Sequence, residues 1–328
     1  MPRFAAVGAL ALLAVASPAR PAEFLALEGR IPLPAVAGRI DHMAVDLARK
    51  RLIVAEYGND TLDVLDLASG KRVRRISGLD APQGVGYSPK ADLVAVSNGG
   101  DGTVRLYRGG DLAPAGRIAL GEDADNLRID PRDGNLIVAH GKGGLAVIDP
   151  AGRRKVADIA LAAHPEAFQL DAAAGRLFAN LPHAREIAVV DLASGREIAG
   201  WKVPGLSSNF PMALDESGRQ LAVGFWHPPR LVLLDAGTGA VGAELASCAD
   251  ADDAYFDDRR HRLYLSCGAG VVDVFARGAG GYRLAARVRT AAGARTSLFV
   301  PALDRLYVAA PAGLFAGEAA VLVFAPAP

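Results

Sequence analysis

A repeat with a period of about 42 residues runs along almost the whole chain and constrains the fold more than any other feature. Seven short segments share one pattern, an apolar run that ends in Asp in five of the copies. Their last residues are separated by 42, 42, 41, 44, 42 and 44 positions. The segments are IDHMAVD (40–46), PQGVGYS (82–88), ADNLRID (124–130), PEAFQLD (165–171), NFPMALD (209–215), ADDAYFD (251–257) and RTSLFVP (295–301). This period is typical of the blade of a β-propeller, which is built from four strands.

Each copy continues with further strand-like runs that are short and rich in β-branched residues. The second runs begin at Arg51, Asp92, Asn135, Arg176, Gln220, Arg262 and Arg305. The third runs are 62–67, 104–109, 145–150, 187–192, 231–236, 271–276 and 320–325. A fourth, amphipathic run closes the first six copies, as at 71–77, 115–121 and 197–203. The seventh copy ends after its third run, so one outer strand is missing.

The missing strand is available at the other end of the chain. Residues 24–33 (FLALEGRIPL) are strand-like and precede the first copy. We expect this segment to complete the last blade and close the ring, which leaves only short sheet edges. The predicted fold is therefore all-β, a seven-bladed β-propeller closed by an N-terminal strand, with residues 23–328 forming a single domain.

The first 22 residues have the layout of a secretory signal peptide. Arg3 precedes an apolar run from Phe4 to Ala16, and small residues follow. A retained anchor is the alternative, although the run is short for a membrane span and no second long apolar run follows. We expect cleavage near residue 22 and a periplasmic or secreted protein with no membrane span after cleavage. Nothing in the sequence resembles an oligomerisation element, which predicts a monomer.

The chain has two cysteines, Cys248 and Cys267, nineteen positions apart. In an exported protein, two thiols of this kind are expected to form a disulfide. Their spacing fits neither CxxC nor CxxCH. A redox-active or metal-ligating pair is the alternative.

Two of the turns resemble a known repeat. Residues 57–66 (YGNDTLDVLD) and 97–104 (SNGGDGTV) look like the "YVTN" pattern, in which a strand ends near Asn, crosses a Gly-containing turn and continues into the next strand. The whole chain after the signal segment is similar to the YncE-like periplasmic seven-bladed propellers. That resemblance implies binding of a ligand, a surface or single-stranded DNA. Nucleic acid is disfavoured here because 36 basic residues balance 36 acidic ones and only 6% of residues are aromatic.

Propeller geometry places many polar residues on one face. The first strand of each blade lines the central channel, and the loop that enters it lies beside the end of the second strand. We expect the mouth of the channel on this face to be the ligand-binding site. The candidate residues are Arg39, Asp41, His42, Gln83, Asp125, Asn126, His164, Glu166, Asn209, Asp252, Asp253 and Arg295.

Carboxylates and imidazoles in this set are potential ligands of a divalent metal ion, the one cofactor that the sequence suggests. The candidates are His42, Asp125, His164, Glu166 and Asp252. The alternative is that His and Asp collect at this face because its loops are polar. No pair has the short spacing of a known metal motif, so convergence depends on the ring alone.

Two arginines and one tryptophan at the same face have two interpretations each. Arg39 and Arg295 begin neighbouring blades once the ring closes, so they are placed either to clamp an anion or to pair with Asp41 and Asp253. Trp226 either provides a stacking wall for a ligand or packs against the next blade.

The sequence lacks a GxSxG elbow and any local pairing of a Ser or Cys nucleophile with His. We therefore favour an exported binding or scaffold propeller over an enzyme, one that holds a small polar ligand, a metal ion or a partner protein at the channel mouth. The alternative is a metal-dependent hydrolase or lyase, similar to the gluconolactonase and streptogramin-lyase propellers, with a cation at the mouth.

Overall fold

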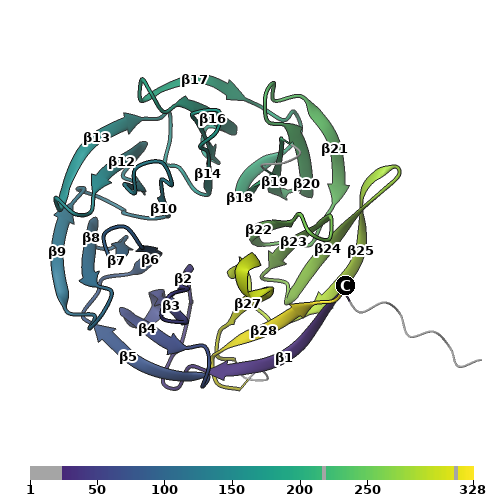
Figure 1. The fold of residues 1–328 in the computed structure, drawn as a ribbon. Helices are drawn as coiled ribbons and strands as arrows, with labels where there is room; N and C mark the ends of the chain where they lie inside the picture. Colours follow the sequence, from purple (N-terminus) through teal and green to yellow (C-terminus); the bar gives the residue numbers. More distant parts are fainter. Residues whose placement is uncertain (1–23, 216–218, 314–316) are drawn as a thin grey trace, which may run out of the picture.

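The computed structural model describes residues 24–215, 219–313 and 317–328. The predicted signal peptide, residues 1–22, lies outside them. Over the described residues the strands form seven four-stranded antiparallel sheets, arranged as blades around a central axis (Figure 1). None of the helices in these ranges is long and apolar enough to cross a membrane. The predicted fold class is confirmed.

Blades 1 to 6 each use four consecutive strands, with the first innermost (Figure 1). Blades 1 and 2 are β2 (Met43–Asp46), β3 (Arg51–Glu56), β4 (Thr61–Asp66), β5 (Lys71–Ser77), then β6 (Pro82–Ser88), β7 (Leu93–Asn98), β8 (Thr103–Arg108), β9 (Pro114–Ala119). Blades 3 and 4 are β10 (Leu127–Ile129), β11 (Leu136–His140), β12 (Gly144–Asp149), β13 (Arg154–Ala160), then β14 (Phe168–Asp171), β15 (Arg176–Leu181), β16 (Glu186–Asp191), β17 (Arg196–Trp201). Blades 5 and 6 are β18 (Ser207–Asp215), β19 (Gln220–His227), β20 (Pro229–Asp235), β21 (Val241–Ala246), then β22 (Ala251–Asp257), β23 (Arg262–Cys267), β24 (Val271–Gly278), β25 (Gly281–Arg289).

Blade 7 joins the two ends of the chain. It combines β26 (Ser297–Val300), β27 (Arg305–Ala310) and β28 (Ala320–Pro326) with β1 (Leu25–Pro32), which pairs antiparallel with β28. The N-terminal segment is therefore the outer strand that the sequence predicted. Two 3-10 turns, η1 (Tyr57–Asn59) and η2 (Pro301–Leu303), complete the described elements.

The core explains why the second and third runs of each copy are continuously apolar. Middle strands such as β3 and β7 are buried along almost their whole length, because neighbouring blades cover both of their faces. Seven hydrophobic clusters are found among the described residues, one between each pair of adjacent blades. Outer strands such as β5 and β13 expose most of their residues.

Each outer strand also carries a register shift against the third strand of its blade, at an equivalent position in all seven described sheets. One extra residue on the outer strand, such as Val73 in β5, increases the local twist and bends the strand. Side-chain periodicity did not indicate this feature, since the inserted residue is exposed or half-buried and its type varies.

Candidate functional site

The channel mouth is built from one backbone position that recurs around the ring. In blades 1, 3 and 4 the residue that enters the first strand donates its N–H to a carbonyl near the end of the second strand. These bonds run from Asp41 to Ala55, from Asp125 to Ala139 and from Glu166 to Asn180, at 2.8, 2.8 and 3.0 Å. The repeat therefore gives three carboxylic acids the same placement. In blades 6 and 7 the equivalent residues are Asp252, beside a register shift, and Arg295.

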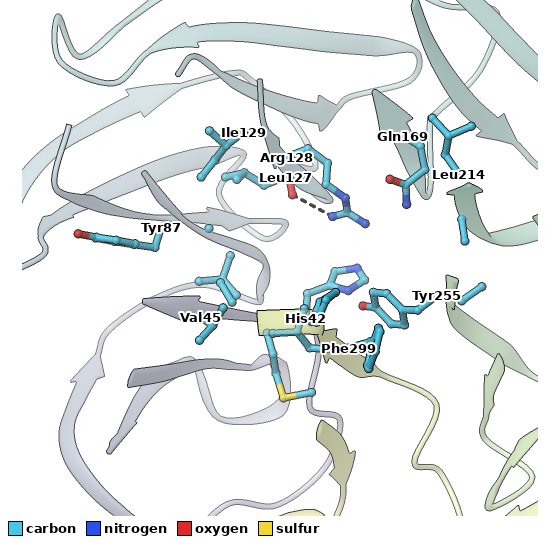
Figure 2. A pocket seen from close by; sticks show the side chains of 18 of the residues that line it. His42, Val45, Tyr87, Leu127, Arg128, Ile129, Gln169, Leu214, Tyr255 and Phe299 are labelled. Carbon is cyan, nitrogen blue, oxygen red and sulfur yellow. Dashed lines mark hydrogen bonds between the residues drawn. The ribbon is translucent and has the colours of Figure 1, made fainter. Parts of the chain in front are cut away.

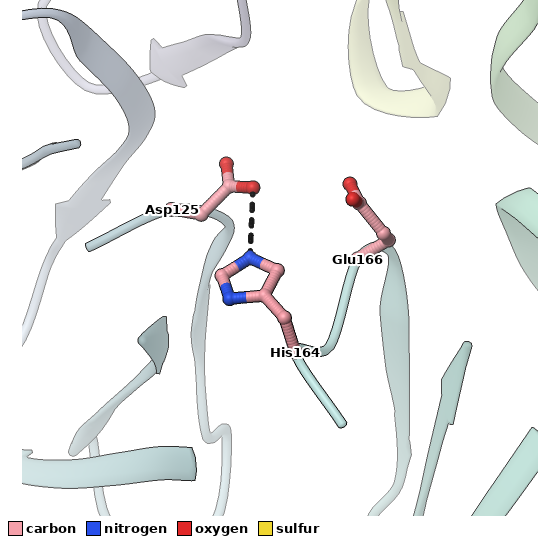
Figure 3. Close-up of side chains that lie close together, drawn as sticks. All are labelled: Asp125, His164 and Glu166. Carbon is pink, nitrogen blue, oxygen red and sulfur yellow. Dashed lines mark hydrogen bonds and ion pairs between the residues drawn. The ribbon is translucent and has the colours of Figure 1, made fainter. Parts of the chain in front are cut away.

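Three of the predicted metal candidates come together here. Asp125, His164 and Glu166 each offer one ligand atom, and these atoms lie within 4.8 Å of one another (Figure 3). His164 lies two residues before Glu166, in the loop between β13 and β14. The other two candidates, His42 and Asp252, are not part of this group.

A hydrogen bond to the backbone fixes the orientation of the His164 ring. Its Nδ1 lies 2.5 Å from the Gly141 carbonyl oxygen, so Nδ1–H donates to that oxygen. Its Nε2 then faces the carboxylate of Asp125, with 3.4 Å between Nε2 and Oδ2 (Figure 3). A backbone carbonyl that holds one ring nitrogen is the usual support of a metal-binding histidine, whose other nitrogen is the ligand atom.

The electrostatics of this mouth show an excess of buried acid. Burial and the charge of Asp125 raise the pKa of Glu166 to about 8, against the opposing effect of His164. Burial lowers the pKa of His164, but its hydrogen bonds to Asp125 and Gly141 outweigh that effect and raise the pKa to about 9. Burial and the charge of Asp41 likewise raise the pKa of Asp252. The two carboxyl shifts come first from burial and then from repulsion by neighbouring carboxylates, which His164, His42 and Arg39 offset only in part.

Asp41 is more deeply buried than Asp125, Glu166 or Asp252. Its side chain is fully buried, and neither of its oxygens accepts a hydrogen bond. Arg39 Nη2 is 2.8 Å from Asp41 Oδ2, an ion pair without hydrogen-bond geometry. Burial raises the pKa of Asp41 to about 7, although the charge of Arg39 opposes this. A buried carboxylate without a hydrogen bond is costly, and a bound cation is one way to offset that cost.

Below the mouth, His42, Asn126 and Asp253 form a second layer, which we call the waist. His42 Nε2 lies 3.2 Å from Asn126 Nδ2, and His42 Nδ1 lies 3.9 Å from Asp253 Oδ1. Asp253 Oδ2 accepts a hydrogen bond from the Ser297 N–H at 2.8 Å. Burial raises the pKa of Asp253 to about 6 against the charge of His42.

The remaining candidates have structural contacts. Gln83 Nε2 lies 3.4 Å from Asp123 Oδ1 at the edge of the mouth. Asn209 is buried, and its Nδ2 donates to Asn180 Oδ1 at 3.0 Å between blades 4 and 5. The asparagine thus joins two blades.

The two arginines differ. Arg39 pairs with Asp41, which is one of the predicted alternatives. Arg295 does not pair with Asp253; its Nη1 lies 2.6 Å from Asp250 Oδ1, because Asp253 is turned toward the Ser297 N–H. The arginines therefore have different acidic partners.

Two further predictions concern blade 6 and its contact with blade 5. Cys248 and Cys267 form a disulfide, which connects the loop before β22 to the end of β23. Trp226 stacks on Phe210, with 4.0 Å between ring centroids, and its Nε1 donates to the Ala251 carbonyl of blade 6 at 2.6 Å. The tryptophan therefore packs against the neighbouring blade, as the second of its two interpretations stated.

The structure adds residues that the sequence analysis did not select. Arg128, Gln169 and Tyr255 extend into a cavity of about 400 Å³ along the channel axis, below the waist (Figure 2). All three belong to first strands, in runs that the repeat had aligned, but no spacing rule separated them from core residues. Their inward direction follows from strand alternation combined with the ring.

Chemically, the mouth can hold a cation with one imidazole and two carboxylates. Three protein ligands leave coordination positions open for a small molecule. Imidazole with carboxylate suits ions such as Zn²⁺ and Mn²⁺.

Comparison with known proteins identifies the architecture and no family. No family model matches the sequence, and no curated protein matches it either. Among solved structures, the chain is similar to Kuenenia stuttgartiensis hydrazine synthase, with 18% identity, a TM-score of 0.74 and coverage of 86% of this chain and 94% of that chain. It is also similar to a chain of the mitotic checkpoint complex, with 12% identity, a TM-score of 0.80 and complete coverage of both chains. At such identities the likeness shows the fold alone, and the chain is a seven-bladed β-propeller.

Proposed function

We propose that this propeller binds a divalent cation at the channel mouth through Asp125, His164 and Glu166, and uses the cation to hold a small polar ligand. The observation that carries the proposal is the convergence of these three ligand atoms within 4.8 Å. Asp41 supports it, since it lies at the equivalent position of blade 1 and has no hydrogen bond to either oxygen.

The charges around the site favour a cation over an empty mouth. Asp125 raises the pKa of both Glu166 and Asp41, which means that these carboxylates interact electrostatically across the ring. A divalent ion would replace the repulsion between them with attraction. Arg39, also at the mouth, is placed to contact an anionic group on a ligand of that ion.

We further propose that the protein is exported and acts in the periplasm or outside the cell. The layout of residues 1–22 and the Cys248–Cys267 disulfide both support export, since disulfides persist in oxidising compartments. Membership of the YncE-like group remains part of this proposal and rests on the turns at 57–66 and 97–104.

A second candidate function is metal-dependent hydrolysis or elimination. One observation favours it: three ligands with open positions are typical of catalytic rather than structural metal sites. The cation would polarise a substrate carbonyl, and Asp41, which has no hydrogen bond, is the carboxyl group placed to move a proton.

The test is metal content. Protein purified from the periplasm without chelator or affinity metal is analysed by elemental mass spectrometry, and titrated with Zn²⁺ and Mn²⁺ by calorimetry. We expect one ion per chain in the wild type, and at least about tenfold weaker binding in Glu166→Gln and His164→Ala. His183→Ala is the matched control, since His183 is exposed in the turn between β15 and β16.

Two results would count against the proposal. The absence of metal from the wild type, together with no heat on titration, would remove the cation site. Equal affinity in Glu166→Gln and wild type would place the ion elsewhere. Once a metal is found, turnover of lactones and esters that is lost in Asp41→Asn, with metal retained, would favour the enzyme over the binding protein.

A further inference from the structure

The cavity below the waist is lined by none of the three residues Asp125, His164 and Glu166, although His42 of the waist forms part of its wall. Its walls come from the first strands of all seven blades. Most of the lining is apolar, including Val45, Val85, Ile129, Leu214, Leu298 and Phe299 (Figure 2). First strands run from the mouth toward the opposite face, so Val45 and Ile129, late in their strands, lie farther from the mouth than His42 or Asn126. The cavity is therefore polar at its inner end and apolar beyond it.

Arg128 places a positive charge in this apolar space. Its hydrogen bonds come from one nitrogen, Nη1, which donates to Asn126 Oδ1 and to the Leu127 carbonyl at 2.9 Å. The guanidinium also lies 5.7 Å from the centroid of the Phe168 ring. None of the ion pairs found in the described part of the chain includes Arg128, and the acid that interacts with it electrostatically, Asp253, does so without a direct contact. A permanent cation among apolar walls, with unused donors, favours an anionic partner.

The groups beside Arg128 are already held in place. Tyr255 donates its hydroxyl to the Ser297 carbonyl at 2.7 Å, and Gln169 donates from Nε2 to the Met212 carbonyl at 2.9 Å. Arg128, Gln169, Tyr255 and His42 point toward a common space (Figure 2). A ligand group that enters this space therefore meets one fixed cation and oriented polar side chains.

We propose that this cavity binds an amphipathic monocarboxylate of the medium-chain fatty acid class. The carboxylate would pair with the free donors of Arg128, and the hydrocarbon chain would extend away from the waist along Val45, Ile129 and Leu298. This arrangement gives Arg128 a directly paired carboxylate, where Asp253 now acts on it only over a longer distance, and covers apolar wall that otherwise faces water. A cavity of about 400 Å³ is within the size range of small-molecule sites.

The experiment is calorimetric titration of the purified full-length mature protein with sodium decanoate below its micelle concentration. Decanol and acetate are the comparison probes. Decanol has the hydrocarbon chain without the negative charge, and acetate has the negative charge without the long hydrocarbon chain. We expect decanoate to bind with one molecule per chain, and both comparison probes to bind at least about tenfold more weakly.

Two variants locate the site. Arg128→Gln should weaken decanoate at least about tenfold and leave the weak decanol binding unchanged. Val45→Phe, which keeps Arg128 and fills the cavity, should weaken both ligands. Arg283→Gln, on the exposed outer strand β25, is the matched control, and Glu166→Gln should bind decanoate like the wild type, because this site does not depend on the cation. Thermal unfolding confirms that each variant is folded.

Three outcomes would overturn the proposal. The first is that decanoate does not bind to the wild type, and the second is that Arg128→Gln binds decanoate as tightly as the wild type does. The third is that acetate binds as tightly as decanoate. The last would show a small-anion site with no role for the apolar walls.

Discussion

Reduction of the Cys248–Cys267 disulfide should destabilise the protein by an amount that the structure allows us to estimate. The bond connects the loop before β22 to the end of β23, and both side chains are buried. A second contact holds the same loop, since the Cys248 N–H donates to Asp273 Oδ2 at 2.8 Å. We therefore expect the native blade to persist after reduction, with the effect of the cross-link confined to the unfolded chain.

The magnitude follows from the loop that the bond closes. For a sequence separation of 19 residues, the loss of loop-closure entropy in the unfolded chain corresponds to ~3 kcal/mol. With an unfolding entropy of roughly 2.1 cal/mol/K per residue, a chain of 328 residues should lose ~4 °C in Tm.

The assay is urea unfolding of the wild-type protein with and without reductant, followed by circular dichroism. Both samples have the same side chains, so the difference isolates the covalent bond. The Cys248→Ala, Cys267→Ala double variant is the control, since its stability should not respond to reductant. A change below about 1 kcal/mol in the wild type, or an equal response in the double variant, would refute the reasoning.

Two further predictions concern stability. Leu33 is fully buried in the N-terminal segment that closes the ring, so Leu33→Ala should lower the free energy of unfolding in urea by ~3 kcal/mol. Leu27 is 58% exposed in β1, so Leu27→Ala should lower it by less than ~0.5 kcal/mol, and equal effects of the two variants would contradict ring closure by this segment. Burial and a hydrogen bond with Asp63 raise the pKa of Glu56 from 4.5 to about 8, so the folded state retains a proton that the unfolded chain releases between these pH values. Stability should then fall by at most ~1.4 kcal/mol per pH unit as pH rises through that window, and Glu56→Gln should flatten the decline in urea midpoints.

The fold could be predicted from the sequence because one signal was repeated seven times. Each blade alone gives short apolar runs that strands and buried helices share, but the constant spacing of those runs identifies the architecture. The shortage of one strand in the last copy then pointed to residues 24–33. The boundaries of the first strands were less predictable. The repeat placed Asp41 inside the first strand of blade 1, but that strand begins at Met43. The N–H of Asp41 still donates to the Ala55 carbonyl, although this hydrogen bond lies outside the regular strand pairing.

The site was only partly predictable. Asp125, His164 and Glu166 were selected by their place in the repeat, which fixes backbone position around the ring. Pairing between side chains depends on rotamers, and the repeat carries no information on these. Arg295 therefore turned to Asp250 rather than Asp253. Arg128 was missed for a different reason, since a single basic residue in an apolar first strand has no distinguishing spacing.

The mouth position keeps the same backbone hydrogen bond in blades 1, 3 and 4, while its chemistry varies around the ring. Positions that face a neighbouring blade must fill a fixed space, so the second and third strands repeat the same apolar residue types. The residue that enters the first strand faces the axis, where no neighbouring blade constrains its size or charge. It is Asp41 in blade 1, Asp125 in blade 3, Glu166 in blade 4 and Arg295 in blade 7. Each blade can vary at this position without disturbing the core, so a closed ring of similar blades can present a different side chain from each blade. Loss of the repeat pattern at this position therefore marks the part of the molecule that is free to acquire a function.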